Sequence, residues 1–351
     1  MVKRLAFAVP GDLETPTGGY AYDRRIIAEL KTLGWTIDAV DLGDGYPRPD
    51  AANRAAALAL LTRMPPEQPI AIDGLAFGVL PVEAASLYQR NPLIALVHHP
   101  LALESGLSFA DAKNFRASER TALEFARRVI ATSATTANFM TMDYGVPAEH
   151  ITVVRPGNDP VAPAVGSRDG VVRLLAVGSV VPRKGYDVLI AALATLADLP
   201  WRLIIAGDTG RDCVTAAKIE GDIARFKLTD RIALLGAVPS ARLAELYRAA
   251  DLFVLASRFE GYGMAYAEAV AYGLPTIGTT AGAIPDTLSG ESAILVKPDD
   301  VAALARALRR LIADSNERQK ISSAARAAAA RFPTWRDSAE LFAGAIEAAT
   351  K

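Results

Sequence analysis

Short runs of apolar and β-branched residues alternate along the chain with longer segments in which apolar residues recur every three or four positions. A short apolar run is typical of a buried strand, and the longer spacing is typical of an amphipathic helix. In the first half the pattern predicts helices at 20–33, 51–64 and 110–128, and strands at 5–9, 36–41, 70–73, 93–97, 129–132 and 151–154. This alternation is typical of a parallel sheet covered by helices on both faces.

Residues 155–170, RPGNDPVAPAVGSRDG, interrupt the alternation with prolines, glycines and polar residues, the composition of a linker. The alternation then resumes, with helices that begin at Asp187, Asp212, Ser240 and Met264, and strands at 172–177, 202–206, 232–234, 252–255, 276–278 and 293–296. A last amphipathic helix is predicted at 335–348. We therefore expect an α/β protein with two doubly wound, Rossmann-like domains, residues 1–165 and 166–332, a division that suits 351 residues.

The amino-acid composition limits the classes of protein to which the chain can belong. Hydrophobic residues make up 51% and charged residues 22%, as in folded globular proteins, and a net charge of -1 gives no general attraction for nucleic acid. Cys213 is the single cysteine, so no internal disulfide forms, and no Cys/His spacing typical of a metal site occurs. The first apolar run is too short for a signal peptide, and no run approaches the roughly 20 residues that span a bilayer. These features predict a cytoplasmic protein.

Open parallel sheets bind ligands at the carboxyl ends of their strands. After the strand at 252–255 the chain reads SRFEGYGMAYAEAVAYGLPTIGTTAGAIP, in which a glutamate and two glycines precede a helix that begins near Met264. Glycines let the backbone approach a ligand, and the N–H groups of a helix start bind anions. Gly-x-Gly, or two glutamates eight positions apart, also arise by chance in a chain with 39 acidic residues, and the strand–loop–helix setting favours function.

Glu260, seven intervening residues, Glu268 and then AVAYGLP resemble the signature of glycosyltransferase family 4, the group 1 glycosyltransferases of GT-B fold. The resemblance implies that Glu260 holds hydroxyls of the donor sugar and that Glu268 holds the nucleotide ribose. It implies that the backbone meets the sugar and the diphosphate at Gly261, Tyr262, Gly263 and Met264. The family usually has Phe or a similar residue where this chain has Tyr262.

A second resemblance covers LLAVGSVVPRKGYD, residues 174–187, which include most of the strand at 172–177 and the turn after it. In the family a lysine before glycine, with an arginine nearby, neutralises the diphosphate, which points to Lys184 and Arg183. On the residues alone, a basic pair on a loop can also be merely solvated. Many members carry arginine where this chain has Ser179, so either Arg183 supplies the missing charge or the diphosphate binds more weakly.

Further candidates follow other strands. Gly18 and Gly19 match a paired-glycine loop that closes over the donor phosphates; read alone they form a helix-initiating turn, without the third glycine of the dinucleotide fingerprint. His98, ahead of His99, matches a family position that contacts the transferred sugar, and Glu104 is a candidate for orienting the acceptor. Two loops resemble those that line the nucleobase pocket and contribute Gly207 and Val238, with Asp208 as a turn residue.

No Asp-x-Asp pair occurs in the chain, and the other large class of glycosyltransferases uses that pair to hold a divalent metal. We therefore expect no metal ligands, and protein cations and helix N-termini that stabilise the departing diphosphate. The resemblance implies a retaining transfer from a UDP- or GDP-sugar as co-substrate, without a further cofactor. The sequence offers no well-placed carboxylate nucleophile, so a front-face attack by the acceptor is expected, with Arg183, Lys184, Glu260 and His98 as catalytic residues.

In GT-B proteins the last helix crosses back to the first domain, which assigns residues 333–351 to it. Two alternatives stay open: a GT-B nucleotide-sugar epimerase and a non-catalytic two-domain sugar-binding protein. The Pro-Arg-Lys-Gly turn and the paired glutamates favour transfer over both. The sequence leaves open the donor sugar and base, the acceptor and its linkage, the oligomeric state and a peripheral contact with the inner face of the membrane.

Overall fold

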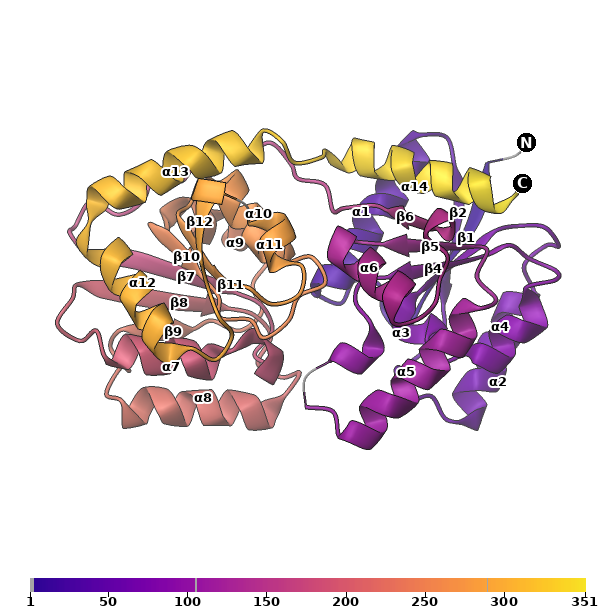
Figure 1. Ribbon diagram of the computed structural model, residues 1–351, viewed down its shortest axis with the longest axis horizontal. Helices are drawn as coiled ribbons and strands as arrows, with labels where there is room; N and C mark the ends of the chain where they lie inside the picture. The colour runs from indigo at the N-terminus through magenta and orange to yellow at the C-terminus, as the bar shows by residue number, and fades with distance from the viewer. Residues whose placement is uncertain (1–2, 105, 289) are drawn as a thin grey trace. The chain divides into compact units, whose positions relative to one another are not determined.

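The computed structural model describes residues 3–104, 106–288 and 290–351. The chain forms two compact units (Figure 1), one from Met1–Gly157 with Pro333–Lys351 and the other from Asn158–Phe332. Among the described residues, no helix combines the length and the apolar character needed to cross a membrane.

The first unit contains a six-stranded parallel sheet in the order β2-β1-β3-β4-β5-β6. Its strands are β1 (Arg4–Val9), β2 (Thr36–Asp41), β3 (Ile70–Asp73), β4 (Leu93–Val97), β5 (Arg128–Ala131) and β6 (Ile151–Val153). Its helices are α1 (Gly18–Thr32), α2 (Ala51–Thr62), α3 (Gly74–Phe77), α4 (Pro81–Leu87), α5 (Phe109–Leu123), α6 (Ala134–Met142) and α14 (Trp335–Ala349), with 3-10 turns η1 (Leu101–Leu103) and η2 (Ala148–His150). Strands β3 and β4 are buried along their whole length, as a sheet covered on both faces requires.

The second unit contains another six-stranded parallel sheet, in the order β12-β11-β10-β7-β8-β9. Its strands are β7 (Val172–Val177), β8 (Trp201–Ala206), β9 (Ile232–Leu234), β10 (Leu252–Val254), β11 (Thr276–Thr279) and β12 (Ala293–Val296). Its helices are α7 (Tyr186–Ala194), α8 (Cys213–Arg225), α9 (Ser240–Ala249), α10 (Met264–Ala271), α11 (Ile284–Thr287), α12 (Val301–Ala313) and α13 (Ser315–Ala329), with 3-10 turns η3 (Pro182–Lys184) and η4 (Gly290–Ser292).

The expected pair of doubly wound domains is confirmed, and each predicted strand lies within one residue of an observed one at either end. The helices are less well predicted. The helix expected at 110–128 ends at Leu123, because the chain must turn before β5 begins at Arg128. The short helices α3, α4, α6 and α11 were not predicted, since four to nine residues carry little periodicity.

Each sheet has one place where the strand order reverses. In the first unit it lies between β1 and β3, and in the second between β7 and β10. Loops that leave neighbouring strands at such a point diverge to opposite faces of the sheet and leave room for a ligand at the carboxyl ends. The loops after these four strands are therefore where functional side chains are expected.

The last helix, α14, packs in the first unit beside α1 (Figure 1). The Phe342 ring lies 6.0 Å from the Phe7 ring of β1, and the Ser338 hydroxyl donates to the Arg155 carbonyl at 2.7 Å. The expected return of the last helix to the first domain is thus confirmed.

Residues 158–165 belong to the second unit, although the sequence placed them in the first domain. Ala164 and Val165 donate their N–H groups to the Tyr272 and Arg248 carbonyls, both at 2.8 Å. These bonds tie the segment to the helical layer of the second unit.

Candidate functional site

A buried glutamate joins two cations at the strand-order reversal of the second unit. Arg183 and Lys184 lie in η3 after β7, and Glu260 lies in the loop after the adjacent β10. Lys184 Nζ donates to Glu260 Oε1 at 2.7 Å, and Arg183 Nη1 donates to Oε2 at 3.0 Å. The structure therefore brings together three residues that the sequence assigned to catalysis from two separate motifs.

The Glu260 carboxylate is almost fully engaged. Ser257 Oγ also donates to its Oε1 at 2.7 Å. Among the described residues, three of the roughly four acceptor positions of the carboxylate are therefore taken, and the remaining one is on Oε2. Burial alone would raise the pKa of Glu260, but the charges of Lys184 and Arg183, with the hydrogen bonds from Lys184 and Ser257, lower this pKa to about 2. Glu260 is thus ionised near neutral pH, and the three ionised side chains carry a net charge of about +1.

Gly185 allows η3 to lie against the end of β10. Its φ is +64°, in the left-handed region, and a Cβ at this position would lie 2.0 Å from the Ala256 carbonyl oxygen. Any larger residue would push the turn, and with it Arg183 and Lys184, away from Glu260. The Arg-Lys-Gly order therefore has a structural reason as well as a chemical one.

Helix α10 begins next to Glu260. Gly263 is its N-cap residue, with a φ of +92°, and no side chain caps the helix start at Met264. Uncapped N–H groups at a helix N-terminus suit an anion. Of the neighbouring predicted residues, Tyr262 is buried, and its carbonyl accepts from the Thr287 hydroxyl at 2.6 Å, which holds the loop that also contains Gly261.

Glu268 lies on α10, half-buried, and is separate from the Glu260 cluster. Burial raises its pKa and the negative charge of Asp159 adds to this, whereas a hydrogen bond from Tyr247 opposes it. The Tyr247 hydroxyl also lies 3.2 Å from the Ala265 carbonyl. A carboxylate held this way keeps acceptor capacity for a polar ligand, as its predicted role requires.

Three loops of the second sheet meet through glycines. Gly207 donates to the Gly236 carbonyl at 2.9 Å, and a Cβ on Gly207 would lie 1.9 Å from the Gly178 carbonyl oxygen. Ser179 comes directly after Gly178, next to this close contact between the loops. Val238 lies in the loop after β9 and packs, partly buried, against the core. The expected nucleobase loops thus lie at one sheet edge. The neighbouring Asp208 carboxylate accepts from the Gly210 N–H at 2.8 Å, as a turn residue does.

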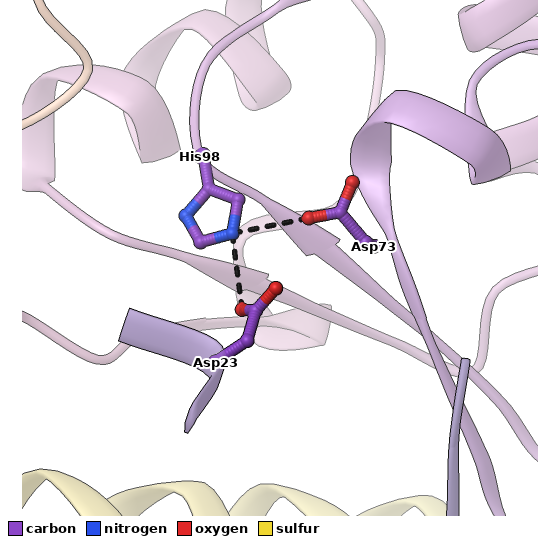
Figure 2. A group of neighbouring side chains, drawn as sticks. All are labelled: Asp23, Asp73 and His98. Carbon is purple, nitrogen blue, oxygen red and sulfur yellow. Dashed lines mark hydrogen bonds and ion pairs between the residues drawn. The ribbon is translucent and has the colours of Figure 1, made fainter. Parts of the chain in front are cut away.

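His98 lies between two buried carboxylates in the first unit (Figure 2). It follows β4, and its Nε2 is 3.2 Å from Oδ1 of Asp23 on α1 and 3.2 Å from Oδ2 of Asp73 at the end of β3. Asp23 is 0% exposed and Asp73 is 3% exposed. Figure 2 shows the other ring nitrogen of His98 on the side turned away from both carboxylates.

This surrounding makes His98 a cation. Burial would lower its pKa, but the charge and hydrogen bond of Asp23, and then those of Asp73, raise it to about 10. Burial raises the pKa of Asp23, and the charge and hydrogen bond of His98 oppose that change. Asp23 Oδ2 is buried without a hydrogen-bond partner among the described residues. The group therefore consists of an imidazolium between two carboxylates, with a net charge of about -1.

The paired glycines lie beside this histidine. Gly18 is the first residue of α1, which Thr17 caps by accepting from the Tyr20 N–H. A Cβ on Gly19 would lie 3.5 Å from the His98 ring, so the backbone of α1 passes close to the imidazole at this glycine. Two residues predicted from separate motifs are thus brought together.

His99 does not join this group. Its Nε2 lies 3.2 Å from Oε2 of Glu104, so His99 pairs near η1 with the residue that the sequence indicated as a candidate for orienting the acceptor. His98, ahead of His99 in the sequence-based ranking, is the one that enters the buried cluster.

Several residues of these clusters were not singled out from the sequence. Asp23 is an acid on the apolar face of an amphipathic helix, beside Tyr22 and Ile26, and such a misplaced charge is a signal that was available. Asp73 is the last residue of a strand at the strand-order reversal, and a carboxylate at that position also indicates a functional site. Ser257 and Arg258 lie inside the motif that contains Glu260, but nothing in the sequence distinguishes them from their neighbours.

In the described parts of the chain, one group of side chains has ligand atoms close enough to hold a metal ion. Its atoms, from Asp23, Asp73 and His98, lie within 4.8 Å of one another. The sequence predicted no metal ligands because these three residues are far apart in the chain and match no spacing. Their short mutual distances also fit direct ion pairing without a metal.

The chain matches two family models that together cover most of its length. Residues 26–161 match the model described as Glycosyltransferase Family 4, and residues 162–328 match that of Glycosyl transferases group 1. The two matches meet at residues 161 and 162, close to the division between the structural units.

The chain is also similar to curated proteins, among them the following two. The chain is 28% identical to the MMP alpha-(1->4)-mannosyltransferase of Mycolicibacterium hassiacum, over 88% of this chain and 77% of the relative. It is 34% identical to the mannosylfructose-phosphate synthase of Agrobacterium fabrum, over 49% of this chain and 42% of the relative. The chain therefore spans less than half the length of the second protein.

The fold is shared with a solved structure, Anabaena HepE in complex with UDP and glucose. The TM-score is 0.77 at 19% identity, over 99% of this chain and 100% of the other. This likeness confirms the expected fold of two Rossmann-like domains.

We predict that His98 keeps both ring protons through neutral pH. Because its pKa is raised from 6.5 to about 10, the stabilisation it gives the fold should be complete below pH 6.5 and lost as the pH rises through about 10. Nitrogen NMR of the three histidines, His98, His99 and His150, measures this directly. Asp73→Asn should lower the pKa of His98 by roughly one unit or more, since one charge partner is lost.

Two outcomes would contradict this prediction. The first is a His98 ring that titrates near 6.5 in the folded protein. The second is a ring that loses a proton when manganese or zinc is added at neutral pH, which would make the cluster a metal site instead.

Proposed function

We propose, since the chain belongs to the group 1 glycosyltransferases of family 4, that it transfers a sugar from a nucleotide diphosphate sugar to an acceptor hydroxyl. The observation that supports this most is the cluster of Arg183, Lys184 and Glu260 at the strand-order reversal of the second unit. A pair of fixed cations beside an uncapped helix start suits the diphosphate of such a donor. The alternatives, an epimerase and a non-catalytic sugar-binding protein, have no specific observation in their favour.

The cations would act mainly on the leaving diphosphate. Negative charge on it grows as the bond from its oxygen to the sugar anomeric carbon breaks, so groups fixed beside it bind the transition state more strongly than the bound donor. Arg183 and Lys184 are held in place by Glu260 before the donor arrives, which avoids a reorganisation cost during the reaction. Arg183 takes the place of the arginine that many members have where this chain has Ser179.

Glu260 is poorly suited to be a nucleophile. Its pKa of about 2 makes it a weak base, and both of its oxygens already accept hydrogen bonds. A covalent glycosyl–enzyme intermediate on this residue is therefore disfavoured. The open acceptor position on Oε2 suits a hydroxyl of the donor sugar. We infer a front-face, retaining transfer, in which the acceptor oxygen bonds to the anomeric carbon while the diphosphate leaves and a diphosphate oxygen takes the acceptor proton.

His98 is assigned to the sugar as a donor of a hydrogen bond. A histidine with a pKa of about 10 is protonated at neutral pH and has no lone pair to act as a base. The two carboxylates around it give the group a net negative charge. This charge suits a sugar that gains positive charge at its anomeric carbon. Glu268 is assigned to the ribose, and the loops with Gly207 and Val238 to the base.

The donor and the acceptor are proposed only as classes. HepE was solved with UDP and glucose, which favours a UDP-sugar as the first donor to test. A glycan, a lipid-linked glycan and a small molecule all offer the hydroxyl that the mechanism needs. We propose a reaction without a metal, because Arg183 and Lys184 supply the positive charge that a metal would bring to the diphosphate.

The function is tested by a screen of UDP- and GDP-sugars with excess EDTA in every reaction. Without an acceptor, slow hydrolysis of one donor to nucleoside diphosphate and free sugar is expected, with less than about a twofold loss caused by EDTA. Activity that returns only with manganese or magnesium would contradict the metal-free reaction. A nucleotide sugar converted to its epimer, or binding of free sugars alone, would favour one of the two alternatives.

We predict that Lys184→Ala lowers kcat about 10²–10³-fold with saturating donor, the usual loss for one preorganised charge-stabilising group. Arg183→Ala should lower kcat nearly as much, because it replaces the usual arginine. Steady-state kinetics with the donor found in the screen measure both. Lys320→Ala on α13, which removes an exposed lysine away from the cluster, is the matched control and should keep wild-type kcat. Wild-type kcat in Lys184→Ala would place the diphosphate elsewhere.

A further inference from the structure

We propose that Arg258 is a positioning residue, which fixes the η3 turn and so sets where Arg183 and Lys184 lie. Arg258 is two residues before Glu260 in the loop after β10. The inference rests on the proposed function of the two cations, and it adds a residue to which neither the family motif nor the sequence patterns gave a role.

Arg258 holds the backbone of the turn at two successive carbonyls. Its own N–H donates to the Arg183 carbonyl at 2.7 Å, and its guanidinium Nη1 donates to the Pro182 carbonyl. Glu260 binds the side chains of Arg183 and Lys184, whereas Arg258 binds the main chain beneath them. One loop thus fixes both the backbone of the turn and the charged ends of its side chains.

The same guanidinium ties the turn to two other segments. Its Nη2 donates to Oδ2 of Asp187, in the first turn of α7, at 3.1 Å, and its Nε donates to Oδ1 of Asp299, just before α12, at 2.8 Å. Asp187 also accepts from Lys218 of α8 at 3.3 Å. All three guanidinium nitrogens are therefore engaged, in the planar fork that lysine cannot reproduce.

Apolar packing alone does not hold this turn. An open pocket borders it, with walls that include Val181, Pro182, Ile219 and Arg258. Because one side of the turn faces this pocket, the hydrogen bonds of Arg258 supply restraint that side-chain packing lacks there. A reacting group displaced by about 1 Å typically loses about 10² in rate, so restraint of this turn matters for turnover.

Arg258→Ala should lower kcat by about 10- to 100-fold and weaken UDP binding several-fold, with uridine binding unchanged. GDP and guanosine replace these probes if the screen selects a GDP-sugar. Uridine lacks phosphates, so its binding reports on the rest of the second unit. Arg309→Ala is the matched control: Arg309 makes a two-pronged ion pair with Asp198 at 2.7 and 2.9 Å, elsewhere in the same unit, and its loss should leave kcat unchanged.

A double-mutant cycle shows whether Arg258 acts through the cations. In a Lys184→Ala background, the further loss of kcat caused by Arg258→Ala should be clearly smaller than in the wild type, because the group it positions has gone. A role confined to stability would instead give the full loss in both backgrounds and weaken uridine binding as well. Arg258→Lys keeps the charge but not the fork, and should recover less than about a third of the lost kcat.

The outcomes separate this inference from the proposed function. If Lys184→Ala keeps wild-type kcat and UDP binding, the proposed role of the cations fails. If Lys184→Ala loses both while Arg258→Ala or Arg258→Lys keeps wild-type kcat, the role of Arg258 alone is wrong. Should Arg258→Ala not fold, Arg258→Lys and Asp299→Asn test the same restraint. Asp299→Asn should lower kcat several-fold, and no change in either variant would overturn the inference.

Discussion

The candidate site of the second unit depends on the ion pairs that hold Arg183 and Lys184 against the buried Glu260. A carboxylate buried to this extent needs charge partners, and two cations on one turn need an anion to stay together without a ligand. Gly185 lets the turn approach β10, and Ser257 fills another acceptor position of Glu260. The same contacts that stabilise the buried charge therefore fix the positions of the two cations, as the proposed binding of a diphosphate requires.

The first unit also contains a cluster of buried charges, and its net charge is opposite in sign. One imidazolium, His98, lies between Asp23 and Asp73 at its own strand-order reversal. Two cations with one carboxylate leave a net charge of about +1 in the second unit, and one cation with two carboxylates leaves a net charge of about -1 in the first. In the proposed reaction, each cluster thus has a net charge opposite in sign to that of the group it is proposed to bind, the diphosphate or the sugar.

The sequence predicted the strands well, because buried parallel strands are continuous apolar runs bounded by turns. It also predicted that Glu260, Arg183 and Lys184 serve one site, since each follows a strand and matches a motif. It missed Asp23, Asp73 and Arg258, whose roles depend on neighbours far away in the chain. It also missed that Glu260 binds the cations, because a motif gives spacing and not hydrogen-bond partners. The composition of residues 158–165 led to their assignment to the first domain, whereas two backbone hydrogen bonds attach this segment to the second unit.

The role of Glu260 as holder of the cations is tested most directly by Glu260→Gln, with UDP affinity and kcat measured on the same preparation. Glutamine leaves one neutral oxygen for two cations, so the pair loses its alignment while the charge of the cluster rises from about +1 to about +2. We predict that kcat falls about 10²–10³-fold, the loss typical of a preorganised charge site, while UDP binds at least as tightly as in the wild type. A variant with wild-type kcat, or one in which UDP affinity falls as far as kcat, would contradict this role.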